Sequence, residues 1–206
     1  GVNWRKMLAD KNFWKDTLKL DNKLVWQTHL AVKRRLIDWL RIHLEETFKQ
    51  RREDPAHLAV ALSNLDKDPL IIGFARRFAP YKRANLLFHN MARLEKLLSH
   101  EKPLIFLFSG KAHPSDGIGQ ALIRKVIEMS RQPQFVGKIL FVENYDIEVA
   151  QLMVSGCDVW LNTPTRPLEA SGTSGMKAGI NGCINLSVAD GWWVEGFNGK
   201  NGWIIA

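Results

Sequence analysis

One loop of this sequence has the composition of an anion-binding site. The stretch 166–182, RPLEASGTSGMKAGING, follows a short apolar run and passes through small and hydroxyl-bearing residues into a segment that can continue as a helix. The free backbone N–H groups and the dipole of a helix N-terminus attract anions, and glycine lets a phosphate approach the backbone. Lys177 is expected in the first turn of this helix, beside any phosphate held there.

The loop matches neither of the common phosphate-binding motifs. A Walker A loop has its lysine directly after the last glycine, but here Met176 separates Gly175 from Lys177, and Gly-x-Gly-x-x-Gly is absent. These differences disfavour a P-loop ATPase and a simple dinucleotide-binding fold. The alternative interpretation is a glycine-rich turn that caps a helix, with Lys177 as a solvated charge.

Short apolar runs alternate with helical patterns after residue 69. Strands are predicted at 70–74, 104–108, 138–142, 158–161 and 183–188, and helices at 80–99, 116–131, 146–155 and around Lys177. This order predicts an α/β fold, a Rossmann-like parallel sheet with helices on both faces. Residues 1–52 are predicted to be helical, with Asp21 capping the second helix, whereas 57–68 has no clear pattern.

Basic residues gather in the segments that follow the predicted strands. Ligands of parallel sheets bind outside the carboxyl ends of the strands, so the segments 76–83, 109–111, 143–145 and 163–177 are expected at one edge. The cations in these segments are Arg76, Arg77, Lys82, Arg83, Lys111 and Lys177. Together they suit a highly anionic ligand. For Arg83 and Lys111, pairing with surface acids is the alternative.

Composition limits the class of protein. The 206 residues are 46% apolar and 24% charged, without a bilayer-spanning stretch or a visible signal peptide, so we expect a cytoplasmic protein with no membrane partner. The formal net charge of +8 fits nucleic acid, an anionic membrane surface or a phosphate site, but no nucleic-acid-binding motif is present, so no nucleic acid is expected. Cys157 and Cys183 are expected to be buried free thiols, and no metal is expected.

Four sequence blocks resemble a known family. They are GFARRFAPYKR at 73–83, SGKAHP at 109–114, VENYDIEVA at 142–150 and EASGTSGMKAGINGCINLSVADGWW at 169–193. Together they resemble the C-terminal catalytic domain of the α-glucan phosphorylases, which include glycogen, starch and maltodextrin phosphorylases. The resemblance implies the second lobe of a glycosyltransferase-B fold, pyridoxal 5′-phosphate bound as a Schiff base to Lys177, and reversible phosphorolysis of α-1,4-glucans to glucose 1-phosphate.

The resemblance also implies roles for individual residues. Catalytic roles fall on Lys177, Arg77 and Lys82; cofactor binding on Lys177, Arg76, Tyr145, Thr173 and Ser174; and substrate binding on Glu169, Ser171, Gly172, Arg77 and Lys82. Arg76 stands where many members have lysine. Animal and plant members have Ile-His-Glu where this chain has 78–80, Phe-Ala-Pro, and Gly-Asn where it has 174–175, Ser-Gly.

The family's first lobe and its closing C-terminal helices are not in this sequence. We therefore expect a fragment, inactive alone, with residues 1–55 as a helical lead-in and 56–206 as the cofactor- and phosphate-binding domain. The implied partners are α-glucan, inorganic phosphate, glucose 1-phosphate and the missing N-terminal lobe, and the sequence leaves a homo-oligomer open.

Two other functions are weighed against this interpretation. A nucleotide-sugar glucosyltransferase, such as a glycogen or starch synthase, carries a second glutamate eight residues after the first, and here Lys177 stands eight residues after Glu169. This difference favours a phosphorylase. The second alternative is a non-catalytic carbohydrate- or anion-binding domain that kept the fold but lost the chemistry.

Overall fold

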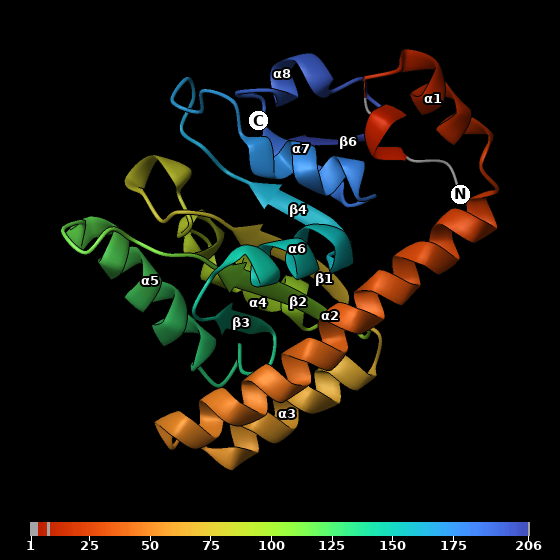
Figure 1. Ribbon diagram of the computed structural model, residues 1–206. Coiled ribbons are helices and arrows are strands. Elements are labelled where there is room, and N and C mark those ends of the chain that lie inside the picture. Colours follow the sequence, from red (N-terminus) through yellow and green to blue (C-terminus); the bar gives the residue numbers. More distant parts are fainter. Residues whose placement is uncertain (1–3, 8, 206) are drawn as a thin grey trace.

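A parallel β-sheet forms the centre of the molecule (Figure 1). The computed structural model describes residues 4–7 and 9–205. Within them six strands pair in the order β3-β2-β1-β4-β5-β6, and every pair is parallel. The strands are β1 Leu70–Ala75, β2 Leu104–Ser109, β3 Ile139–Val142, β4 Val159–Asn162, β5 Ile184–Val188 and β6 Gly202–Ile205. The predicted α/β fold with a Rossmann-like sheet is confirmed.

Helices cover both faces of this sheet. The α-helices are α1 Lys11–Asp16, α2 Asn22–Arg51, α3 Pro55–Asp66, α4 Met91–Leu98, α5 Gly117–Ser130, α6 Ile147–Gly156, α7 Thr173–Ile180 and α8 Trp193–Gly196. Short 3₁₀ helices are η1 Trp4–Met7, η2 Thr17–Lys19, η3 Pro80–Lys82 and η4 Leu86–Phe88. Helices α2, α3, α6 and α7 contribute to one hydrophobic cluster, and α4 and α5 to a second on the opposite face (Figure 1).

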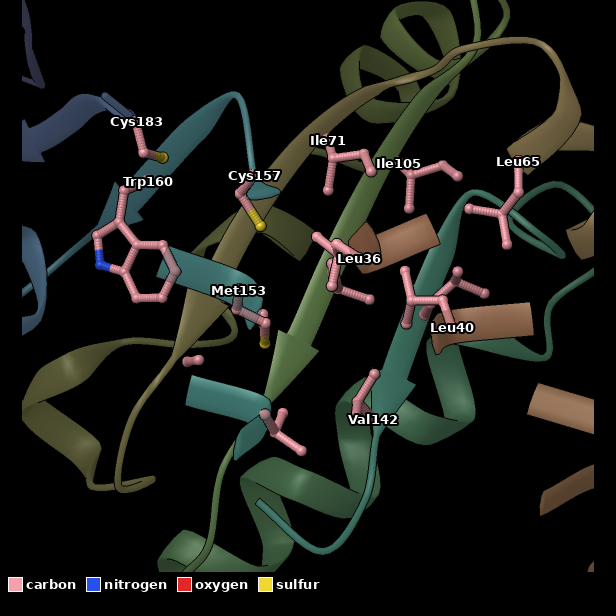
Figure 2. Packing of buried hydrophobic residues seen from close by; sticks show 14 of the residues in the cluster. Leu36, Leu40, Leu65, Ile71, Ile105, Val142, Met153, Cys157, Trp160 and Cys183 are labelled. Atoms are coloured by element: carbon pink, nitrogen blue, oxygen red, sulfur yellow. The ribbon is translucent and has the colours of Figure 1, made fainter. Parts of the chain in front are cut away.

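Successive strand residues face these two clusters in turn. In β1, Ile71 belongs to the cluster with α2, α3 and α6, whereas Ile72 and Phe74 belong to the cluster with α4 and α5. Side chains of a strand point alternately to the two faces of the sheet, so a strand that is apolar throughout is buried on both faces. Figure 2 shows the first cluster, in which Leu36 and Leu40 of α2 lie beside the strands.

The long helix α2 begins and ends where its sequence provides caps. The side chain of Asp21 accepts a hydrogen bond from the Lys23 N–H at 3.2 Å, so the predicted cap is confirmed. At the other end Arg52 takes a left-handed φ of 54°, which stops the helix. The buried residues of α2 are Lys33, Leu36, Leu40 and Leu44. Their spacing of three or four residues marks the face that packs on the sheet.

The prediction of one helix over 80–99 is wrong. Only α4 is α-helical there, after the two short turns η3 and η4. Arg83 ends the first turn with a left-handed φ of 48°, and the side chain of Asn90 starts α4 by accepting a hydrogen bond from the Arg93 N–H at 3.0 Å. The apolar spacing within 86–98 includes the buried residues of α4, but the left-handed turn at Arg83 and the cap at Asn90 divide the predicted helix.

Three other stretches refine the predicted elements. The unassigned stretch 57–68 is largely helical, because α3 runs from Pro55 with Asp54 as its cap. The helical prediction for 1–52 holds in pieces, with breaks before α1 and α2, and residues 1–3 and 8 lie outside the described residues. Strand β6 was not predicted. It is a half-exposed edge strand, with Trp203 53% exposed, although its residues Trp203, Ile204 and Ile205 form a short apolar run.

The predicted domain boundary at residue 55 stays a prediction. Helix α2, on the N-terminal side of that boundary, shares its hydrophobic cluster with the sheet. No helix in the described ranges is long and apolar enough to cross a membrane. Nor do three or more His, Cys, Asp or Glu side chains gather to hold a metal ion in that part of the chain.

A buried charge cluster fixes α2 against the amino edge of the sheet. Asp158, directly before β4, contacts His29 Nε2 at 2.8 Å and Lys33 Nζ at 3.0 Å, and it accepts a hydrogen bond from the Ile71 N–H at 2.8 Å. Lys33 is only 5% exposed, so its charge needs a partner. Burial by itself raises the pKa of Asp158, but the contacts with His29, Ile71 and Lys33 outweigh it, and the pKa lies below its ordinary value.

We predict that Asp158→Ala lowers the free energy of unfolding by about 3–5 kcal/mol at neutral pH, because the buried Lys33 charge then has only the exposed Asp68 carboxylate, at 3.2 Å, as an ion-pair partner among the described residues. Urea unfolding measures the change. Asp16→Ala is the control, because Asp16 pairs with Lys19 at the surface and such pairs contribute about 1 kcal/mol or less. Equal effects of the two substitutions would contradict the prediction.

The loss of stability in Asp158→Ala should also depend on pH. The pKa of Asp158 is lower in the folded than in the unfolded chain. Its stabilisation is therefore fully present above the unfolded pKa, about 3.9, and is lost as the pH falls through the folded pKa. The stability difference between wild type and Asp158→Ala should shrink between neutral pH and about pH 3. A difference that stays constant over this range would refute the assigned role.

Candidate functional site

The candidate site lies where the strand order reverses. β1 is flanked by β2 on one side and β4 on the other, so the chain continues toward one edge of the sheet from β1 and toward the opposite edge from β4. In open parallel sheets, ligands bind at the carboxyl ends of such a pair of strands. The loops that follow these two strands are 76–83 and 163–172, and both carry predicted site residues.

Hydrogen bonds hold the two loops together. Arg83 donates from Nε to the Thr163 carbonyl and from Nη2 to the Pro164 carbonyl, both at 2.9 Å. In the opposite direction, the Thr163 hydroxyl donates to the Lys82 carbonyl at 2.9 Å. Arg83 therefore joins the loops through backbone carbonyls instead of pairing with a surface acid.

Glu169 lies at the centre of the charged groups. Its side chain is 6% exposed, and its Oε2 atom accepts a hydrogen bond from Arg76 Nη1 at 3.3 Å and a shorter one from Lys82 Nζ. Two cations thus share one carboxylate oxygen, which leaves a net positive charge. Burial weakens the screening of these charges by water. The fold brings together Glu169, predicted to bind the sugar, Arg76, predicted to bind the cofactor, and Lys82, predicted to bind substrate and take part in catalysis.

The Arg76 guanidinium is buried and incompletely paired. Burial lowers its pKa, and the neighbouring Glu169 carboxylate opposes this shift, so arginine remains charged at neutral pH. Its Nη2 atom donates to the Ser174 hydroxyl at 3.1 Å. Its Nε atom has no hydrogen-bond partner among the described residues. Because buried donors in proteins are nearly always paired, this nitrogen indicates a place for an acceptor that is not part of the chain.

Ser174 connects Arg76 to helix α7. Its hydroxyl oxygen also accepts a hydrogen bond from Trp160 Nε1 at 3.3 Å. Trp160 is completely buried on β4, and sequence reasoning missed it as a site residue. The sequence does contain a signal for this role. A buried indole N–H needs an acceptor, and a tryptophan near the carboxyl end of a predicted strand has its acceptor at the site.

The turn after β5 holds the backbone beside Glu169. Asp190 accepts hydrogen bonds from the N–H groups of Glu169 at 2.9 Å and Gly191 at 3.0 Å, and the Trp192 N–H donates to the Ser171 carbonyl at 2.8 Å. Gly191 has a φ of 55°, and a Cβ there would lie 2.5 Å from the Ser171 oxygen. Only glycine fits this close approach, so the segment 169–171 is rigidly placed.

Helix α7 begins earlier than the sequence suggested. It starts at Thr173, after Gly172 in a left-handed conformation with φ of 79°. Lys177 is the fifth residue of α7 and lies in its second turn, so its predicted place in the first turn is wrong. The first turn contains Thr173 and Ser174, whose N–H groups belong to the helix end that attracts anions. Lys177 itself is exposed.

Tyr145 and Arg77 are two further residues that were predicted to belong to the site. Burial raises the pKa of Tyr145, and the positive charge of Arg76 partly offsets the rise, so the two side chains are within electrostatic range of each other. Arg77 follows Arg76 directly but is exposed. The binding and catalytic roles of all these residues stay predictions.

Two buried asparagines form the floor under α7. Asn162 donates to the Ser187 hydroxyl and Asn185 donates to the Gly175 carbonyl, both at 3.1 Å. A Cβ on Gly175 would lie 2.7 Å from Asn185 Oδ1, so glycine lets α7 lie directly on β5. Sequence reasoning did not identify either asparagine. Their signal is a polar residue within or at the end of an apolar strand.

Comparison with known proteins places these features in a family. The family model described as carbohydrate phosphorylase matches residues 41–198. Maltodextrin phosphorylase of Thermococcus litoralis is 48% identical over 206 residues, which cover 100% of this chain and 24% of that protein. Glycogen phosphorylase of Aquifex aeolicus is 43% identical over 98% of this chain and 30% of that protein, and glycogen phosphorylase of Mycobacterium bovis is 42% identical over 96% and 23%. The chain thus spans about a quarter of the length of these curated relatives.

We predict that Asp190→Ala loosens the Glu169 segment. The substitution leaves the buried Glu169 N–H without its acceptor, so the free energy of unfolding falls by about 1–3 kcal/mol and hydrogen exchange at the Glu169 amide accelerates. Chemical denaturation and amide exchange measure the two effects. Glu195→Ala, at an exposed position of α8, is the control and should change stability by about 0.5 kcal/mol or less. Unchanged exchange at Glu169 would count against the role of Asp190.

Proposed function

This chain belongs to the carbohydrate phosphorylase family, and we propose that it provides the cofactor and phosphate site of an α-glucan phosphorylase. The reaction is the reversible phosphorolysis of α-1,4-glucan to glucose 1-phosphate. One observation carries the proposal: Arg76 and Lys82 meet at Glu169, at the carboxyl ends of β1 and β4 and beside the first turn of α7. Because the chain covers 24% of the length of one relative, we assign to it only the steps that its own residues support.

The residues at this site fit pyridoxal phosphate. Arg76 offers a buried nitrogen without a partner among the described residues, and the first turn of α7 offers backbone N–H groups. We propose that Arg76, Tyr145, Thr173 and Ser174 hold the cofactor and that Lys177 anchors it covalently. When bound, the cofactor supplies a phosphate whose second pKa, about 6, suits proton exchange with inorganic phosphate.

The cations of the site allow two phosphates to lie close together. Like charges a few ångströms apart repel each other, most strongly where water is excluded. The Lys82 side chain is 11% exposed, so its charge is weakly screened, and Arg76 is buried beside it. In the proposed function, Lys82 and Arg77 bind the substrate phosphate and orient it, which stabilises charge during the transfer.

The sugar is assigned to the segment that begins at Glu169. A carboxylate accepts hydrogen bonds from hydroxyl groups, and Ser171 and Gly172 add backbone and hydroxyl groups next to it. Asp190 holds the backbone of this segment, so the acceptor is placed before the sugar arrives. We assign the remaining glucan contacts to an N-terminal lobe of the kind found in the family.

A cytoplasmic location belongs to the same proposal. Cys157 and Cys183 are both free and buried, and burial raises the pKa of each thiol. Protonated, buried thiols are inert, and unpaired cysteines are typical of a reducing compartment.

The experiment is to add pyridoxal phosphate to the purified chain, reduce the mixture with borohydride and map the labelled peptide. We expect a near-ultraviolet absorption band and a label on Lys177. Lys177→Ala should lose the label, whereas the control Lys125→Ala, which removes an exposed lysine of α5, should keep it. A label spread evenly over the exposed lysines, unchanged in Lys177→Ala, would refute the proposed cofactor site.

A further inference from the structure

The residues assigned to two different ligands are bound to each other. Lys82 is assigned to the phosphate and Glu169 to the sugar, yet their side chains form an ion pair that Arg76 shares. Both cations donate to the same oxygen, Glu169 Oε2. The side chains of Arg76 and Glu169 are each 6% exposed, and that of Lys82 is 11% exposed. The free chain therefore neutralises part of its own anion site.

The charges of this cluster do not allow a phosphate to be added without a rearrangement. Arg76 and Lys82 carry two positive charges, and Glu169 carries one negative charge. A phosphate group brings between about 1.5 and 2 further negative charges at neutral pH. Inside a poorly screened site, a carboxylate and a phosphate on the same two cations repel each other strongly. One of the two anions must therefore withdraw.

The structure allows the Glu169 side chain to be the group that moves. Its backbone N–H is held by Asp190 at 2.9 Å, so the segment stays in place while the side chain changes to another rotamer. The two cations have other contacts that remain: Arg76 donates to Ser174 at 3.1 Å, and Lys82 lies 4.6 Å from the centre of the Tyr81 ring. Both cations therefore stay in position for an incoming anion.

We propose that Glu169 is an internal counter-anion of the phosphate site. It occupies Arg76 and Lys82 in the free chain, and inorganic phosphate displaces its carboxylate. This inference rests on the proposed function for its second step, in which the released carboxylate accepts hydrogen bonds from the sugar hydroxyls. Because each ligand weakens the same ion pair, each favours the binding of the other, and this coupling is reciprocal.

The test is isothermal titration of the cofactor-free chain with inorganic phosphate. Glu169→Gln keeps the size of the side chain but removes the competing charge. We expect it to bind phosphate about 10- to 100-fold more tightly than wild type, because one charge-assisted contact no longer has to be broken. Glu53→Gln is the matched control, since Glu53 pairs with Arg131 at 2.7 Å outside the site. Its phosphate affinity should equal that of wild type.

A second readout follows the contact itself. An amine-reactive reagent should modify Lys82 faster in Glu169→Gln than in wild type, and added phosphate should slow this reaction in the variant. Mass spectrometry of the Lys82 peptide measures the rate. If the Glu169 carboxylate had a merely structural role, phosphate would slow the modification of Lys82 equally in wild type and in Glu169→Gln.

Several outcomes would overturn the inference. If folded Glu169→Gln binds phosphate no more tightly than wild type, or if neither protein binds it, Glu169 does not compete with the anion. If Glu169→Gln does not fold, Glu169→Asp replaces it, because its shorter side chain draws the charge away from Lys82. That variant should bind phosphate more tightly than wild type, and wild-type affinity would equally refute the inference.

The two proposals fail in different experiments. Unchanged phosphate affinity together with a cofactor label on Lys177 would refute the counter-anion and leave the phosphorylase function standing. Tighter phosphate binding by Glu169→Gln without any label on Lys177 would support the counter-anion and refute the proposed cofactor site. Glu169 would then occupy an anion site that serves another function.

Discussion

The site depends on the pairing of β1 with β4. These strands are neighbours in the sheet although two complete strand–helix units separate them in the chain. Gly73 permits the close packing there, because a Cβ would lie 2.6 Å from the Cys157 sulfur and 3.1 Å from the Trp160 ring. At the amino end of the pair, Asp158 accepts the Ile71 N–H. At the carboxyl end, the same pairing places Arg76 opposite the loop that carries Glu169.

The two buried charge clusters at the ends of this pair differ in one physical respect. Asp158 is held on both oxygens by His29, Lys33 and a backbone N–H. Its pKa is depressed, and its contacts with His29 and Lys33 fix α2 against the sheet. Around Glu169, by contrast, two cations share one oxygen, and Arg76 keeps a buried nitrogen without a partner in the described chain. Both oxygens of Asp158 thus have partners within the chain, whereas the second cluster combines an excess of positive charge with a buried arginine nitrogen that has none among the described residues.

Two residues that depart from the resembled family pattern are in contact. Arg76 stands at a position where many members have lysine, and Ser174 at a position where animal and plant members have glycine. In the structure, Arg76 Nη2 donates to the Ser174 hydroxyl at 3.1 Å. A guanidinium has more donors than an ammonium group and fixed directions for them. The Ser174 hydroxyl thus accepts one of the donors of the buried Arg76 guanidinium.

The sequence by itself determined the elements whose cause is local. The central strands are short and largely apolar runs, the cap at Asp21 follows from side-chain chemistry, and the charged segments after the strands were recognisable as one edge of a parallel sheet. Only the tertiary structure decided the rest. Arg83 reaches the carbonyls of Thr163 and Pro164 on the loop after β4, and β6 pairs with β5. Likewise, Glu169 meets Arg76 and Lys82 across 93 and 87 residues of chain. Such contacts depend on which strands become neighbours, and local periodicity carries no information about that order.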